Sequence, residues 1–151
     1  MRRISPTDNA VKYIKKALIK IEKQQEHDEE KVDKAIKRLK EHSGVNLHLG
    51  DHFKVHDKIG GNKVIESSES RSHMYVGRKE VSLDGDIHVV GRRSGHERNH
   101  MVHYKIENGH VNREICNEEV SPTISRFDLA IIPSDDRIQI FNIGINKTDL
   151  Y

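Results

Sequence analysis

The longest helix pattern in this chain lies at residues 5–44, whose sequence is SPTDNAVKYIKKALIKIEKQQEHDEEKVDKAIKRLKEHSG. Ser5, Pro6 and Asp8 are typical of a helix start, because serine caps free amides, proline suits the first turn and an acidic side chain favours the positive end of the helix dipole. Gly44 is a natural helix stop. No glycine or proline interrupts the roughly 38 residues between these signals, which predicts one helix about 57 Å long.

Apolar side chains in this stretch repeat every seven residues. Counting Val11 as position a, the a positions are Val11, Leu18, Gln25, Val32 and Leu39, and the d positions are Ile14, Ile21, Asp28, Ala35 and His42. An apolar stripe with alternating spacings of three and four residues, flanked by lysine and glutamate, predicts a coiled coil. We therefore expect an oligomer interface made by Val11, Ile14, Leu18, Ile21, Gln25, Val32, Ala35 and Leu39.

The middle of the stretch is polar, and residues 24–30 contain no apolar side chain. One interpretation is a polar layer in a continuous coil, which fixes register and strand number at a cost in stability. The other is a bend that folds residues 6–23 back on residues 31–43 as a helical hairpin. We favour the continuous coil because the heptad register passes through the polar segment without a skip. In either case the stripe needs a partner surface, since an isolated helix is only marginally stable.

After Gly44 the pattern changes to short β-like runs separated by turn signals. We divide the chain into an N-terminal helix at residues 1–44, a polar β-repeat region at residues 45–120 and a C-terminal β hairpin at residues 121–151. The hairpin is the most apolar part of the chain, with a turn at residues 133–136, and is the best candidate for a small core. The predicted fold class is therefore α+β.

Glycine recurs with a period of eight within the polar β-repeat region. Gly61, Gly77 and Gly85 take the fourth place in their blocks, and valine or isoleucine closes the same three blocks. Because glycine adopts backbone angles that are closed to other residues, glycine at a fixed interval predicts strands joined by regular corners. Two architectures fit the repeat: a narrow stacked β structure, which needs few hydrophobic residues, and an antiparallel meander with glycine at its turns.

Residues 58–63, KIGGNK, and residues 75–89, YVGRKEVSLDGDIHV, are similar to blocks of the octad-repeat β-helix in the spikes of contractile phage tails and type VI secretion systems. The resemblance implies a trimeric β-helix, in which three copies of the chain wrap around one axis into a stiff needle. It implies a structural protein of a phage tail, a baseplate spike in the virion or a related injection apparatus, with other tail or baseplate proteins as partners. The resemblance covers residues 58–90 and departs from the pattern at residues 66–73, which lack glycine.

The composition limits other classes of function. Of the 151 residues, 34% are hydrophobic and 33% are charged, which is little apolar material for a deep catalytic cleft. The formal charge of +2 gives no strong electrostatic reason to expect a nucleic acid or an anionic membrane as a partner. The single cysteine excludes a multi-cysteine zinc site, and we expect no cofactor. No apolar run approaches the about 20 residues of a membrane span, so we expect a protein made in the cytoplasm.

Eleven histidines raise the question of catalysis or metal binding. His100 and His103 would point to opposite faces of a strand, which disfavours a chelating pair, and we expect no metal site. A metal-free ribonuclease needs histidines that transfer protons and a cation that holds phosphate, and His100, His103 and Arg98 are the candidate set for that chemistry.

Taken together, these patterns favour a mechanical role, that of an oligomeric rod with a coiled-coil stem, a β-repeat shaft and a C-terminal hairpin. The alternative is a compact α+β monomer in which a helical hairpin covers an antiparallel sheet. Such a monomer would act as a toxin-like ribonuclease or as a small module that binds a host protein.

Overall fold

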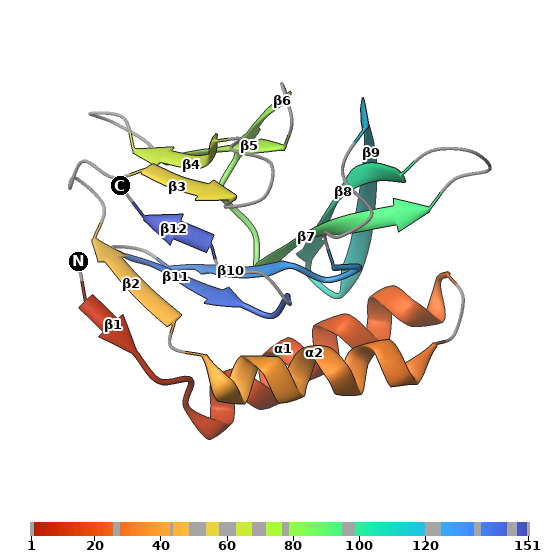
Figure 1. Ribbon diagram of the computed structural model, residues 1–151, viewed down its shortest axis with the longest axis horizontal. Coiled ribbons are helices and arrows are strands. Elements are labelled where there is room, and N and C mark those ends of the chain that lie inside the picture. The colour runs from red at the N-terminus through yellow and green to blue at the C-terminus, as the bar shows by residue number, and fades with distance from the viewer. Residues whose placement is uncertain are drawn as a thin grey trace.

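The computed structural model describes residues 2–25, 28–42, 44–48, 54–57, 63–67, 72–76, 79–94, 99–119, 125–134, 137–144 and 148–150. Its elements combine two helices with two antiparallel sheets (Figure 1). In chain order they are β1 (Arg2–Ile4), α1 (Asp8–Lys23), α2 (Glu29–Glu41), β2 (Gly44–His48), β3 (Lys54–Asp57), β4 (Lys63–Ser67), β5 (Ser72–Val76), β6 (Lys79–Ser82), β7 (Ile87–Ser94), β8 (Asn99–Glu107), β9 (His110–Glu119), β10 (Leu129–Pro133), β11 (Arg137–Asn142) and β12 (Thr148–Leu150).

The N-terminal stretch forms a helical hairpin, so the prediction of one long coiled-coil helix is wrong and the alternative is confirmed. Helix α1 begins after Thr7, whose hydroxyl accepts a hydrogen bond from the Ala10 amide at 3.1 Å. It ends at Lys23, and Asp28 precedes the first residue of α2. The hairpin brings both halves of the apolar stripe onto one surface, whereas a straight helix of this length would leave one half without a partner in the same chain. Gly44 begins β2.

A seven-stranded antiparallel sheet lies against this hairpin, with the strand order β1-β2-β11-β10-β7-β8-β9. The predicted C-terminal hairpin is confirmed: β10 and β11 pair with Ile131 opposite Ile140. Among the strands of this sheet, these two come last along the chain, yet they lie in its middle, between β2 and β7. Strands from before and after residue 120 therefore share one sheet.

The second sheet has five strands in the order β12-β3-β4-β5-β6, and all of its pairs are antiparallel. The β-helix prediction is therefore wrong, and the alternative of an antiparallel meander is confirmed for β3 to β6. A regular glycine spacing serves a chain reversal as well as a helical corner, so the period alone did not separate the two architectures. Gly85 follows β6 with a φ of 87°, a left-handed conformation that favours glycine. Gly61 and Gly77 lie outside the described residues.

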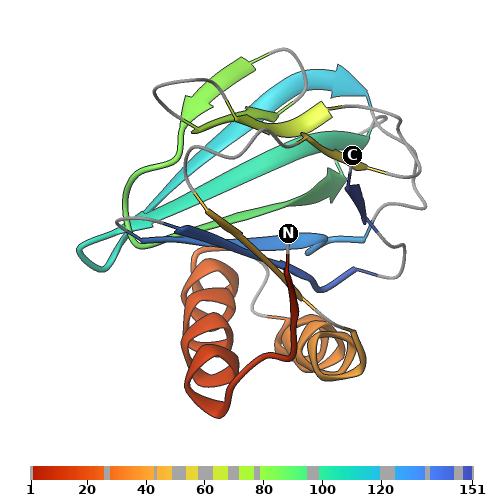
Figure 2. The ribbon, with the colours of Figure 1, turned by 90° about the vertical axis from the view of Figure 1, so that its left-hand side faces the viewer.

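The elements form three layers, in which the seven-stranded sheet separates the helices from the five-stranded sheet (Figure 1, Figure 2). The face toward the helices carries the main hydrophobic core, which consists of Ile14, Ala17, Leu18, Ile21, Val32, Ala35, Ile36, Leu39, Ile87, Val89, Val102, Tyr104, Ile106, Phe127, Ala130, Phe141 and Ile143. The opposite face carries the alternate residues of the same strands, among them Val90, Met101, Ile131, Ile138 and Ile140, which are also buried. Both faces of the sheet are thus covered.

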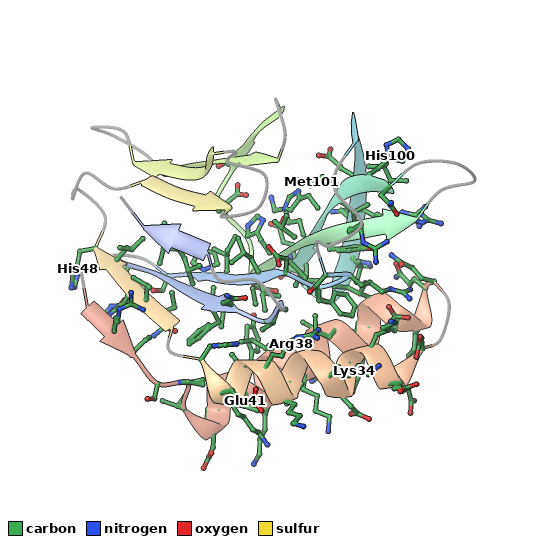
Figure 3. The ribbon with its side chains drawn as sticks, viewed as in Figure 1. Lys34, Arg38, Glu41, His48, His100 and Met101 are labelled. Atoms are coloured by element: carbon green, nitrogen blue, oxygen red, sulfur yellow. The ribbon has the colours of Figure 1, made fainter. Side chains whose placement is uncertain are left out.

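Helix α2 is tied to the sheet by a polar contact as well as by the core. Arg38 points from α2 toward the sheet (Figure 3), and its Nε donates a hydrogen bond to the carbonyl oxygen of Ile143 at 2.9 Å. Ile143 directly follows β11, and its own amide donates to the carbonyl oxygen of Asp128 at 3.0 Å. The contact therefore links α2 to both strands of the C-terminal hairpin.

Candidate functional site

Two histidines form a buried pair on the face of the seven-stranded sheet away from the helices. His88 on β7 and His103 on β8 are 0% and 3% exposed. Nδ1 of His88 lies 2.8 Å from Nε2 of His103, and the two ring planes are inclined by only 5°, with centroids 5.1 Å apart. Nε2 of His88 contacts the carbonyl oxygen of Asp84, which only accepts. A neutral His88 therefore carries its proton on Nε2, and its Nδ1 accepts a hydrogen bond from Nε2 of His103.

Burial determines the charge state of this pair. Desolvation lowers the pKa of His88, and the positive charge of Lys105 lowers it further, although the contact with the Asp84 carbonyl opposes both effects. Lys105 lies opposite His88 on β8 and forms ion pairs with Asp84 and with Glu107, the latter at 3.5 Å. The hydrogen bond between Lys105 and Asp84 raises the pKa of the lysine and lowers that of the carboxyl. His88 is thus neutral at pH 7 and enclosed by the sheet.

The three residues of the ribonuclease alternative do not form one site among the described residues. His100 and Met101 are neighbours at the start of β8 (Figure 3). The pairing of β7 with β8 places His100 opposite Arg93 and His103 opposite Val90, so the two histidines point to opposite faces, as predicted. His103 contacts His88 instead of His100. Arg98 lies outside the described residues.

The positions expected at an oligomer interface lie within the core of the chain itself. Six of them, Ile14, Leu18, Ile21, Val32, Ala35 and Leu39, are at most 1% exposed and pack against the seven-stranded sheet. Val11 is partly buried against the same cluster. Gln25 donates a hydrogen bond from its side-chain amide to the hydroxyl of Tyr104 on β8. The stripe therefore has its partner surface within the same chain.

A buried ion pair fastens the turn of the helical hairpin. Oε1 of Glu22, which is 2% exposed, lies 3.0 Å from Nη2 of Arg126, and Oε2 of the same carboxylate accepts a hydrogen bond from the Asp28 amide at 3.1 Å. The Arg126 guanidinium also reaches the side-chain oxygen of Gln25 at 3.5 Å. One carboxylate thus caps the start of α2 and neutralises a cation from the segment before β10. We assign this group a structural role.

The two edges of the seven-stranded sheet differ in length. Strand β1 at one edge has three residues, whereas β9 at the other edge has ten. Asn112, Arg113 and Ile115 on β9 are exposed, and Ile115 is a large hydrophobic residue at 46% exposure. Within the described part of the chain, no strand pairs with the outer side of β9. Among the described residues, this edge is therefore the longer of the two edges of the sheet.

The sequence did not single out His88, the Glu22–Arg126 ion pair or the β9 edge. His88 stands in an otherwise apolar run, Ile87-His88-Val89-Val90, and that context is a signal for a buried histidine. Its partner, by contrast, depends on the register between β7 and β8, which the sequence does not give. The edge position of β9 follows from the order of all seven strands.

Comparison with known proteins identified no relative of this chain. No family model, no curated protein and no solved structure matches this chain. Across the described ranges, no group of three or more histidine, cysteine, aspartate or glutamate residues is placed to hold a metal ion. Neither α1 nor α2, the helices within those ranges, is long and apolar enough to cross a membrane.

Proposed function

We propose that this chain is a protein-binding module that receives an extended segment of a partner along the outer edge of β9. The observation that carries the proposal is the ten-residue edge strand with Ile115 exposed in its middle. An edge strand presents a row of backbone amides and carbonyls that pair readily with an added strand. Main-chain hydrogen bonds supply affinity in this mode of recognition, and alternate side chains supply specificity.

The opposite edge of the sheet is protected, and this contrast supports the choice of β9. Strand β1 is short and begins with Arg2 and Arg3, and short, charged edges discourage strand addition. Strand β9 carries charges too, but Ile115 lies between them and exposes an apolar surface to solvent. An added strand would cover this side chain.

Two side chains define the chemistry of the partner. Arg113 and Ile115 are two residues apart and therefore lie on the same face of β9, opposite Tyr104 and Val102 of β8. Side chains directly across an antiparallel pair interact, and opposite charges or apolar pairs stabilise the pairing. We therefore infer a partner segment in which an acidic and an apolar residue stand two positions apart.

A synthetic ten-residue peptide tests the proposal. In this peptide every second residue is threonine, and one aspartate and one valine occupy consecutive positions between the threonines, so that they lie two positions apart. The control peptide has the same composition, but its aspartate and valine are adjacent. We expect the first peptide to slow hydrogen–deuterium exchange of the β9 amides and to bind more tightly than the control. Ile115→Lys should weaken binding about tenfold, which corresponds to about 1.4 kcal/mol.

Tyr13→Lys is the matched control, because Tyr13 is a large hydrophobic residue that is 40% exposed on α1 and not on β9. It should bind the peptide as the unaltered chain does. Equal binding of the two peptides, or protection of amides elsewhere with β9 unchanged, would contradict the proposal.

The predictions of a phage tail, baseplate spike or injection apparatus, of a homotrimer and of a location in a virion or secretion apparatus stay untested. They began from the coiled-coil and octad patterns, and those residues fold as a hairpin and a meander. Strand addition at β9 is compatible with membership of a larger assembly, since a second copy or a neighbouring subunit could supply the added strand. Native mass spectrometry of the purified chain distinguishes a trimer from a monomer.

A further inference from the structure

We propose that the solvent face of α1 binds the sugar-phosphate backbone of a nucleic acid without regard to sequence. The surface is a row of four lysines, Lys12, Lys16, Lys20 and Lys23, which we call the lysine ridge. It lies on a different element from the β9 edge, so it stands independently of the proposed function. Partner strand addition and nucleic-acid binding are therefore separable by mutation.

The spacing of the lysine ridge follows from helix geometry. Lys12, Lys16 and Lys20 are separated by four residues and Lys23 follows three residues later, so all four lie along one side of α1. The opposite side of α1 is buried, with Ile14, Leu18 and Ile21 at 0% exposure. Lys12, Lys16 and Lys23 are exposed along about 16 Å of helix axis, and Lys20 is half-buried beside Gly109 in the turn between β8 and β9.

The charge of the ridge is not matched within α1. The helix contains five lysines and two acidic residues, and one of those acids, Glu22, is buried against Arg126. The other, Asp8, lies in the first turn. Among the residues that the structure describes, no carboxylate lies within 4.0 Å of a lysine of the ridge. Like charges four residues apart repel each other on a helix, and an anion bound to the ridge would relieve this repulsion.

Helix α2 shows the ordinary arrangement and serves as an internal comparison. Its lysines share the helix with acidic residues, and Lys34 forms an ion pair with Glu30 one turn away at 3.5 Å. Lys31, Lys37 and Lys40 are also exposed, but four acidic residues accompany them on the same helix. The whole chain has a formal charge of only +2, which is why the sequence predicted no nucleic-acid partner. The fold places the unbalanced positive charge on α1.

The geometry favours a nucleic acid over a membrane. A helix that lies in a membrane surface inserts its apolar side among the lipids, but the apolar side of α1 is occupied by the sheet. A duplex carries about one phosphate charge per 1.7 Å of its axis, so a straight row of cations about 16 Å long neutralises several phosphates at once. Phosphate contacts of this kind hold a nucleic acid without reading its bases.

The experiment is fluorescence anisotropy with a labelled 20-base-pair DNA duplex and, separately, a labelled 20-nucleotide RNA strand, each at several salt concentrations. The test variant is Lys12→Gln, Lys16→Gln and Lys23→Gln together, because glutamine keeps helix propensity and removes the charge. The control variant is Lys31→Gln, Lys34→Gln and Lys37→Gln on α2, which changes the net charge equally. Circular dichroism verifies that both variants are folded.

We expect the unaltered chain to bind both probes, with an affinity that falls as salt increases. The α1 variant should bind at least tenfold more weakly at low salt. The slope of log K against log[salt] should become shallower by about 2 to 3, since about one counterion is released for each phosphate contact. The α2 variant should differ by less than threefold.

Three outcomes would overturn the proposal. One is equal weakening of both variants, which assigns the effect to net charge alone. Another is no binding of either nucleic acid at low salt. The third concerns anionic phospholipid vesicles, which are tested in parallel. If the vesicles bind through the lysine ridge and neither nucleic acid binds, the proposal is wrong.

Discussion

The two faces of the seven-stranded sheet are both buried but are built differently. The face toward the helices is a continuous cluster of aliphatic and aromatic side chains, with the buried carboxylate of Glu22 at the helix turn. The face toward the five-stranded sheet places two histidines, His88 and His103, among aliphatic residues. The first face is therefore stabilised mainly by packing, whereas the stability of the second also depends on the protonation of an imidazole pair.

Consecutive residues on β11 separate the contributions of the two faces. Phe141 points to the helices and Ile140 to the five-stranded sheet, at 1% and 4% exposure. We expect Phe141→Ala to lower the free energy of unfolding by about 3–5 kcal/mol and Ile140→Ala by about 2–5 kcal/mol, because both leave cavities. Urea denaturation measures both values. A loss below about 1 kcal/mol for Ile140→Ala would mean that the five-stranded sheet does not cover that face.

Substitution of the buried carboxylate of Glu22 should give the next largest change in the free energy of unfolding. Glu22→Gln removes the charge that faces Arg126 and weakens the acceptor for the Asp28 amide, so it should lower the free energy of unfolding by about 2–4 kcal/mol. Glu30→Gln is the matched control, since its ion pair with Lys34 is exposed and contributes about 0.5 kcal/mol or less. Chemical denaturation of the two variants gives the comparison. Equal losses would show that the Glu22–Arg126 pair is solvated.

The histidine face should make stability depend on pH. The unfolded chain binds a proton on His88 near pH 6.5, whereas burial lowers the pKa of this histidine in the folded chain. Below about pH 6.5 the unfolded state therefore binds more protons, and the free energy of unfolding falls with decreasing pH, by at most about 1.4 kcal/mol per pH unit for one proton. Urea titrations between pH 7.5 and pH 5 measure this slope.

A double variant isolates the contribution of His88 and His103 to this pH dependence. His88→Leu together with His103→Leu replaces both hydrogen-bonding partners with apolar side chains and should flatten the slope between pH 7.5 and pH 5. An unchanged slope in this variant would assign the pH dependence to other groups. Lys105, Asp84 and Glu107 are the charged residues nearest to His88 on that side.

The sequence predicted those features that local signals define. The C-terminal hairpin was found because two apolar runs flank Pro133 and Ser134, and the meander was one of two architectures that the glycine spacing allowed. The heptad stripe was identified correctly as a buried surface, but the surface that it packs against was predicted wrongly. A stripe of this width packs equally well on a second helix or on a sheet, and only the seven-stranded sheet of the same chain resolves the choice.

The histidine pair and the β9 edge depend on long-range arrangement, and for that reason the sequence did not reveal them. The pairing of His88 with His103 depends on a register between strands, and the exposure of Ile115 depends on which strand ends the sheet. The lysine ridge was visible as five lysines in residues 8–23, but a count over the whole chain averaged it with acidic segments elsewhere. A charge count for each helix alone would have shown it.

The position of β10 and β11 has a consequence for how the polypeptide reaches its native state. Val45 of β2 pairs with Ile140 of β11, and the two flanking parts of the sheet join only through β10 and β11, which follow all the other strands of this sheet along the chain. Contacts this distant in sequence slow folding, because the intervening loop must close before they are gained. The seven-stranded sheet is therefore completed only once β10 and β11 have been synthesised, and we expect its two flanking parts to assemble on them in one cooperative step.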